Sequence, residues 1–226
     1  MSRPYVLLSC AMSVDGYIDD AGPARLELSS PEDFDRVDAE RARADAILVG
    51  AGTVRRDDPR LLVRSPDRRR ERLERGLPAS PLRVTLTAGG DLDPARRIFA
   101  GDDAGSLVYC PTPLAESLQG RLQERAAVVG LGPVLELDAL LEDLAARGVG
   151  RLMVEGGSNL HTGFLVQGLA DELQLAVAPF LVGDACAPRF VGPGPFPHGP
   201  ANPMALAEVR RLGGVVLLRY LLRPSS

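Results

Sequence analysis

Mostly apolar runs alternate with segments of helical spacing along most of this chain. The apolar runs lie at residues 5–12, 46–49, 82–86, 106–109 and 152–154. Short runs of this kind are typical of strands buried on both faces of a parallel sheet. Helical patterns lie between them, at residues 31–43, 114–125 and 138–147. This alternation predicts an α/β domain with a mostly parallel central sheet flanked by helices.

The pattern changes toward the C-terminus. Residues 173–177 alternate between apolar and polar side chains, and two further strand patterns follow at 205–212 and 214–222. We expect these last two to form a hairpin that gives the sheet an antiparallel edge. The chain shows no internal repeat and no composition break, so we expect a single domain over residues 1–226.

The best-marked helix begins within residues 29–33, which read Ser-Ser-Pro-Glu-Asp. A serine can cap the helix, proline suits its first turn, and the two acids lie near the positive end of the helix dipole. We expect this helix to end near Arg43 and to bury Phe34 and Val37.

Composition excludes several classes of function. The chain has 226 residues, a net charge of −4 and no tryptophan, which argues against a general nucleic-acid surface. The arginine-rich residues 68–75 also contain glutamates, as solvated helical turns do. Three widely spaced cysteines and two histidines predict no zinc site or other metal site and no disulfide framework. The first apolar run is too short for a membrane span, so we expect a cytoplasmic protein.

The segment at residues 151–163 carries the strongest chemical signal. Glu155 follows a buried run, and two glycines come directly after it. We expect Ser158 or Asn159 to cap the helix that follows. A strand, a glycine turn and a helix start together present backbone N–H groups to a phosphate, with a carboxylate beside them to bind a polar substrate. The alternative is a tight turn whose glycines only relieve backbone strain.

A second small-residue segment follows the run at 46–49. Residues 50–59 read Gly-Ala-Gly-Thr-Val-Arg-Arg-Asp-Asp-Pro and begin with residues that permit close approach by a ligand. Thr53 can donate a hydroxyl to that ligand. The alternative is a glycine turn that leads into a short solvated helix.

Asp15 and His161 each have two possible roles. Asp15 lies in a Ser-Val-Asp-Gly turn at residues 13–16, and we expect it to stabilise that turn. His161 is expected either to contact a cofactor phosphate or to lie exposed at the helix start.

Three motifs together resemble a known family. They are the turn at residues 13–16, residues 45–61 (DAILVGAGTVRRDDPRL), and residues 154–173, which begin VEGGSNL. Their order and spacing resemble the pyrimidine reductase of riboflavin biosynthesis, which is the C-terminal half of a bifunctional deaminase–reductase or a stand-alone enzyme. The resemblance extends from Tyr5 to about Leu222, and no deaminase signature is present.

The resemblance implies a fold, a reaction and a set of site residues. The fold would be dihydrofolate-reductase-like, and the protein a homodimer. The reaction would use NADPH to reduce 5-amino-6-(5-phosphoribosylamino)uracil at C1′ of the ribose, which gives the ribitylamino product. The implied cofactor contacts are Met12, Thr53, Asp57, Thr87, Gly156, Gly157, Ser158, Asn159, Leu160 and Gly163. The implied substrate contacts are Arg41, Leu61, Arg64 and Glu155, and the implied catalytic residues are Glu155 and Asp57.

The chain also departs from the family pattern. The family often has a serine and a tryptophan where this chain has Ala24-Arg-Leu-Glu27, and it has a serine or threonine near Ala88 for which Thr87 can substitute. These departures favour, as an alternative, a related reductase of another pterin or pyrimidine. A non-catalytic nucleotide-binding module is a further alternative. A Rossmann dehydrogenase is disfavoured because the glycines do not form GxGxxG.

Overall fold

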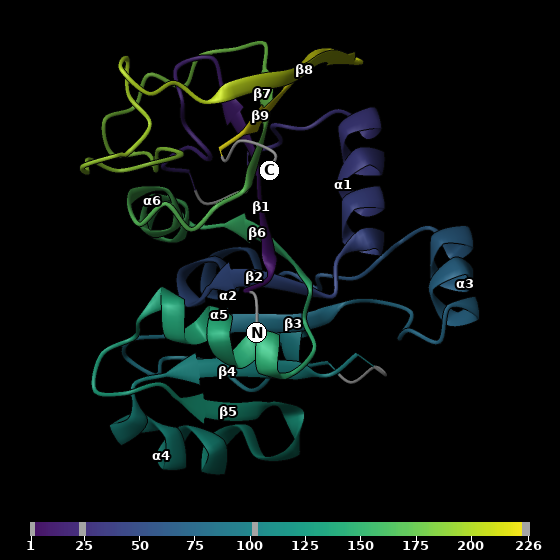
Figure 1. The fold of residues 1–226 in the computed structure, drawn as a ribbon, viewed down its shortest axis with the longest axis vertical. Helices are drawn as coiled ribbons and strands as arrows, with labels where there is room; N and C mark the ends of the chain where they lie inside the picture. The colour runs from purple at the N-terminus through teal and green to yellow at the C-terminus, as the bar shows by residue number, and fades with distance from the viewer. Residues whose placement is uncertain (1–2, 23–25, 101–103, 223–226) are drawn as a thin grey trace. The chain divides into compact units, whose positions relative to one another are not determined.

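The computed structural model describes residues 3–22, 26–100 and 104–222 of the chain. Its nine strands form one mixed sheet in the order β5-β4-β3-β2-β6-β1-β7-β9-β8 (Figure 1). The pairs β5–β4, β4–β3, β3–β2 and β1–β7 are parallel, whereas β9 runs antiparallel to both of its neighbours. This confirms the predicted α/β fold with its antiparallel C-terminal edge.

The chain divides into two compact units. The first unit contains residues 1–5 and 38–153, and the second contains residues 6–37 and 154–226. Helix α1 (Pro31–Arg43) and strand β6 (Arg151–Gly156) contribute residues to both units. The single domain expected over residues 1–226 stays a prediction.

The first unit is built on four parallel strands. They are β2 (Ala46–Gly50), β3 (Leu82–Leu86), β4 (Ser106–Cys110) and β5 (Ala127–Gly130). The helical segments around them are α2 (Ala51–Asp57), α3 (Pro66–Glu74), η1 (Arg97–Phe99), α4 (Thr112–Leu122), η2 (Gln123–Arg125) and α5 (Leu137–Ala146). Strand β5 was not predicted, because its four residues are partly exposed and give no buried run.

The second unit is built on β1 and three C-terminal strands. β1 (Tyr5–Ser13) pairs in parallel with β7 (Glu172–Ala178), in a register that sets Leu7 opposite Glu172. β9 (Val215–Leu221) then pairs with β7 and with the edge strand β8 (Ala205–Leu212), which forms the predicted hairpin. Helix α6 (Ser158–Val166) follows β6 directly.

The start of α1 corrects one expectation. Ser30 caps the helix as predicted, since its hydroxyl accepts the N–H of Asp33 at 3.2 Å. The predicted buried face is wrong: Phe34 is 36% exposed and Val37 is only half-buried, whereas Asp33 and Arg36 are 0% and 7% exposed.

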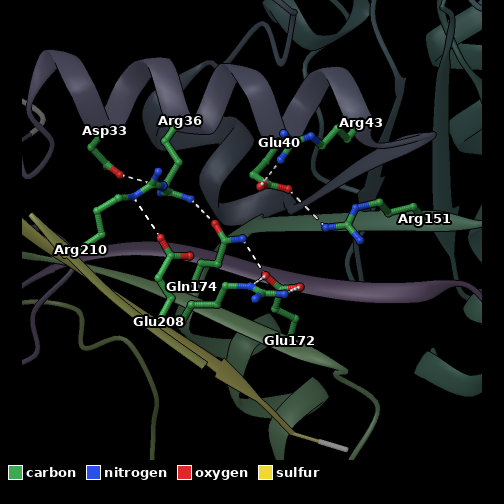
Figure 2. A network of polar contacts seen from close by, with 10 residues as sticks. Asp33, Arg36, Glu40, Arg43, Arg151, Glu172, Gln174, Glu208 and Arg210 are labelled. Carbon is green, nitrogen blue, oxygen red and sulfur yellow. Dashed lines mark hydrogen bonds and ion pairs between the residues drawn. The ribbon is translucent and has the colours of Figure 1, made fainter. Parts of the chain in front are cut away.

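Polar partners explain this inversion (Figure 2). The Arg36 guanidinium binds Asp33 at 2.7 Å and donates to the side-chain oxygen of Gln174 on β7. Gln174 in turn donates to Glu172, which forms an ion pair with Arg219 on β9. The strands therefore present polar groups to α1, and the polar face of the helix is the one that is buried.

Candidate functional site

The junction between β6 and α6 provides one group of predicted site residues, all in the second unit. Glu155 is half-buried near the end of β6, and Gly156 is the last residue of the strand. Gly157 follows with φ +99°, a conformation that L side chains rarely adopt. It is the N-cap of α6, so the backbone turns from strand to helix within one residue.

The predicted serine or asparagine cap of α6 is wrong. Among the described residues, the N-cap makes no side-chain hydrogen bond. Ser158 instead donates its hydroxyl to the carbonyl of Arg189, and Thr162 donates to the carbonyl of Ser158 at 2.6 Å. Because the first N–H groups of a helix lack intrahelical acceptors, the start of α6 can bind an anion.

The side chains around this helix start differ in exposure. Asn159 is exposed, Ser158 and Gly163 are half-buried, and Leu160 is buried at 6%. Leu160 can therefore offer a ligand little besides its backbone. Met12, the other predicted cofactor contact in this unit, is half-buried on β1, which neighbours β6 in the sheet order.

Asp15 has the structural role that we predicted. Its carboxylate accepts the Ser13 hydroxyl at 2.5 Å and the backbone N–H groups of Val182 and Gly183 at 2.8–3.2 Å. The Ser13 hydrogen bond, followed by those from the backbone, holds the pKa of Asp15 below its usual range. The carboxylate thus connects the turn at residues 13–16 to the turn after β7.

His161 is not exposed, which corrects one of its two possible roles. It is 0% exposed within α6, and its ring lies 5.2 Å from that of Phe190 between centroids. Within the described residues neither ring nitrogen has a hydrogen-bond partner, and burial lowers the pKa of His161 to about 4. The neutral imidazole is therefore packed as an apolar group.

Helix α2 provides the first predicted contacts of the first unit. It begins directly after β2, and Thr53 and Asp57 lie four residues apart on one helix face, both half-buried. Asp58 ends the helix in the left-handed conformation, with φ +43°. Its carboxylate accepts the backbone N–H of Arg97 at 2.7 Å and forms an ion pair with the Arg97 guanidinium.

The structure brings Arg41 together with the segment at residues 61–65. The Arg41 guanidinium, in the last turn of α1, donates to the carbonyl of Leu62 at 3.1 Å. Leu61 is 2% exposed and has φ +54°, while Arg64 is exposed. The three predicted substrate contacts of this unit therefore belong to one local arrangement.

Sequence reasoning did not find the residue that organises this segment. Asp38, on α1, accepts the backbone N–H groups of Arg64 at 2.5 Å and Ser65 at 3.2 Å. It lies in the interior of a helix, where an aspartate gives no motif and no spacing that connects it to Arg64.

Thr87, the remaining predicted cofactor contact, lies directly after β3. Its side chain is 3% exposed, and its hydroxyl accepts the N–H of Gly90 at 3.0 Å. Gly90 has φ +70°, so the hydroxyl stabilises a glycine turn. The roles of all these residues toward a ligand stay predictions.

Comparison with known proteins shows the family. The profile of the RibD C-terminal domain matches residues 4–218 of the chain. The chain belongs to this family. A RibD-family relative in Archaeoglobus fulgidus, named 2,5-diamino-6-ribosylamino-4(3H)-pyrimidinone 5′-phosphate reductase, is 40% identical over 187 residues, covering 82% of this chain and 85% of the relative. A protein of the same name in Methanothermobacter thermautotrophicus is 35% identical over 220 residues, covering 96% and 98%. The chain is thus a member of an oxidoreductase family of riboflavin biosynthesis.

Solved structures agree with the RibD fold. RibD of Acinetobacter baumannii matches with a TM-score of 0.78 at 26% identity, over 97% of this chain and 58% of that protein. A pyrimidine reductase-like protein of Corynebacterium diphtheriae matches with a TM-score of 0.79 at 23% identity, over 96% and 91%. The chain therefore spans little more than half of the Acinetobacter protein.

Two features are absent from the part of the chain that the structure describes. No helix there is long and apolar enough to cross a membrane. No group of three or more histidine, cysteine or acidic side chains there could hold a metal ion.

Proposed function

We propose that this chain is an NADPH-dependent reductase of a ribosylaminopyrimidine 5′-phosphate, acting at C1′ of the ribose. Membership in the RibD family carries the proposal, together with the retention of Arg41, Arg64 and Glu155. Of the two pyrimidines that such a reductase could take, the diaminopyrimidinone is favoured over the uracil, because the two stand-alone relatives described above carry that name.

The start of α6 fits the diphosphate of a dinucleotide. Gly157 has φ +99°, which glycine adopts without strain. Because glycine has no side chain, a ligand can approach the backbone closely at this turn. Gly156, Gly157 and the first residues of α6 would hold the diphosphate through backbone N–H groups. We propose Met12, Thr53, Asp57 and Thr87 as further cofactor contacts, on the basis of the family resemblance.

The substrate contacts follow from side-chain chemistry. Guanidinium groups bind phosphomonoesters bidentately, so Arg41 and Arg64 suit the 5′-phosphate. Glu155 would accept hydrogen bonds from sugar hydroxyls or from the pyrimidine. When bound, the cofactor would supply a hydride for C1′ of the ring-opened ribose. The nitrogen attached to C1′ would receive its proton from solvent or through Asp57.

The test is turnover with a labelled cofactor. Wild-type protein with 4-deuterated NADPH and the diaminopyrimidinone phosphate should give a ribitylamino product that carries deuterium at C1′, identified by mass. The uracil phosphate, dihydrofolate and NADH in place of NADPH are run in parallel. Turnover of dihydrofolate alone would move the assignment to the related-reductase alternative. NADPH binding without turnover of any of these would favour a non-catalytic nucleotide-binding module.

Two substitutions test the site residues. Glu155→Gln should abolish turnover of the phosphorylated pyrimidine, and Arg64→Ala should raise its KM at least about tenfold while turnover stays measurable. Both variants should leave NADPH binding nearly intact, because both residues are assigned to the substrate. NADPH binding is measured by fluorescence titration of the folded variants. Full activity of both variants would show that this assignment is wrong.

We also propose that the protein is a homodimer in which β8 meets β8 of a second copy. β8 is the last strand in the sheet order and exposes Leu206 and Val209 at 57% and 59%, and Val216 on β9 is 41% exposed. A long apolar edge strand is an aggregation liability unless another chain covers it.

All three cysteines are free, which supports a reducing compartment, and we propose the cytoplasm.

A further inference from the structure

The carboxylate of Asp38 gathers three donors from a different part of the chain. It accepts the backbone N–H of Arg64 at 2.5 Å and that of Ser65 at 3.2 Å, and it forms an ion pair with Arg68 at 2.9 Å. Asp38 is 5% exposed, whereas Arg64 is exposed. A buried carboxylate thus fixes the backbone from which an exposed arginine projects.

The segment that Asp38 holds has an unfavourable backbone conformation. Leu61 has φ +54°, a conformation that is unfavourable for a non-glycine residue and persists only where the surroundings enforce it. The side chains of Leu61 and Val63 are both 2% exposed, and the N–H of Val63 donates to the Ser80 hydroxyl at 3.1 Å. Alternating burial of this kind turns the intervening residues outward.

α1 holds the same segment at a second point. Arg41 lies three residues after Asp38, and its guanidinium donates to the Leu62 carbonyl. Side chains therefore form hydrogen bonds with four consecutive backbone groups, the carbonyl of Leu62 and the N–H groups of residues 63–65. Two of these side chains, Asp38 and Arg41, belong to α1. The positions of the two candidate phosphate-binding arginines are consequently set by one helix.

Arg68 compensates the charge of Asp38. The side chains of Arg68 and Asp38 are 24% and 7% exposed. Arg68 also lies in the first turn of α3, where its backbone N–H donates to the hydroxyl of Ser65, the N-cap of the helix. A buried carboxylate without a counter-ion would oppose a phosphate bound nearby. With Arg68 paired to it, Asp38 can order the segment without that opposing charge.

We propose that Asp38 is a positioning residue for Arg64, and that it sets the affinity for the phosphate of the substrate. This inference rests on the proposed function, in which Arg64 binds the 5′-phosphate. Asp38 itself is not assigned a contact with the substrate. Its effect on substrate binding should therefore disappear when the Arg64 side chain is removed.

The experiment is a double-mutant cycle in the full-length protein. Asp38→Ala, Arg64→Ala and the double variant are compared with wild type for KM and kcat, with the phosphorylated pyrimidine and with its dephosphorylated form. Asp38→Ala should raise KM for the phosphorylated substrate about tenfold or more, with little change in kcat or in KM for NADPH. In the Arg64→Ala background the same change should alter KM by less than about twofold.

Two further variants are matched to Asp38→Ala. Asp38→Asn keeps one acceptor oxygen and should give an intermediate KM. Asp67→Ala removes the exposed ion pair with Arg70 on α3, whose side chains are 73% and 65% exposed, and should leave every constant unchanged. Any one of three results would overturn the inference. KM could be unchanged in Asp38→Ala, the effects of Asp38→Ala and Arg64→Ala on KM could be fully additive, or KM could rise equally for the dephosphorylated substrate.

Amide hydrogen exchange separates this inference from the proposed function. Asp38→Ala should speed exchange at residues 62–65, and Asp67→Ala should not. If wild type turns over no ribosylaminopyrimidine phosphate, the proposed function fails whatever the exchange shows. If exchange at residues 62–65 is the same in Asp38→Ala and wild type, the positioning role fails even when the enzyme is active.

Discussion

His161 places an ionisable group in an apolar position inside α6. Burial alone lowers its pKa to about 4, and its ring packs beside that of Phe190. A neighbouring hydrogen bond also holds the loop against α6: the backbone N–H of Gly192 donates to the Thr162 hydroxyl at 2.9 Å. The loop after Arg189 is thus attached to α6 next to a histidine that stays neutral at physiological pH.

The stability of the protein should therefore depend on pH through His161. The folded-state pKa of about 4 lies below the ordinary value of 6.5, so the unfolded chain binds the proton first as pH falls. The free energy of unfolding should fall between about pH 6.5 and pH 4, by roughly 3 kcal/mol in total from this group. His161→Phe removes this contribution.

The measurement is urea unfolding of wild type and His161→Phe at about pH 7 and about pH 4.5. Carboxylates also lower stability in acid, but they do so equally in both proteins. The contribution of His161 is therefore the difference between the two proteins in how much unfolding free energy each loses from about pH 7 to about pH 4.5. An identical loss of unfolding free energy in the two proteins would show that the folded protein accommodates the charged imidazole.

At the scale of elements, α1 combines a buried polar face at its start with the arginine-positioning contacts at its end. Asp33 is 0% exposed, and its carboxylate is neutralised by Arg36. Removal of one partner from a buried pair leaves an uncompensated charge, which typically costs about 3–5 kcal/mol. Replacement of both partners by apolar residues can cost much less.

We accordingly expect Arg36→Met to lower the free energy of unfolding by about 3–5 kcal/mol. The double variant Asp33→Leu/Arg36→Met should recover part of that loss, because no buried charge then remains at this pair. Chemical unfolding at neutral pH measures both variants. If the double variant is less stable than Arg36→Met alone, the pair does not behave as a compensated buried charge.

The start of a helix and the bounds of a strand could be predicted from the sequence where neighbouring residues determine them. The serine, proline and acids of residues 29–33 gave the start of α1, and β3 has the predicted bounds of residues 82–86. The buried face of α1 could not be read in this way, because it depends on Glu172, Gln174 and Arg219 from strands more than a hundred residues away.

The candidate site was predictable to a similar extent. The glycine turn at Gly157 agrees with the motif at residues 154–173. The contact of Arg41 with residues 61–64 agrees with the substrate contacts that the family resemblance implies. Asp38 was missed because two of its three partners are backbone N–H groups, which leave no residue pattern. Ala24 and Arg25, part of the departure from the family pattern, lie outside the described residues.

At the scale of the whole molecule, the exposed edge strand leads to a test of assembly. Val209→Lys on β8 should convert the proposed dimer to a monomer, because it places a charge in the apolar contact between two copies. Val134, in the first unit, is 65% exposed against 59% for Val209, so Val134→Lys is the matched control. Size-exclusion chromatography with light scattering gives the mass. A dimeric Val209→Lys variant, or a monomeric wild type, would contradict the proposal.

The pairing of β1 with β7 also has a consequence for biosynthesis. Val6 donates to the Asp171 carboxylate across 165 residues of sequence, and the register of the two strands begins at the next residues. At ribosomal speeds of ~5–20 residues per second, β1 leaves the ribosome on the order of ten seconds before β7 has been made. Until β6, the other neighbour of β1 in the sheet, has been made, the apolar segment Val6-Leu7-Leu8 has no neighbouring strand to pair with, although it is fully buried in the finished protein. We therefore expect chaperones that bind short apolar segments to recognise the nascent chain.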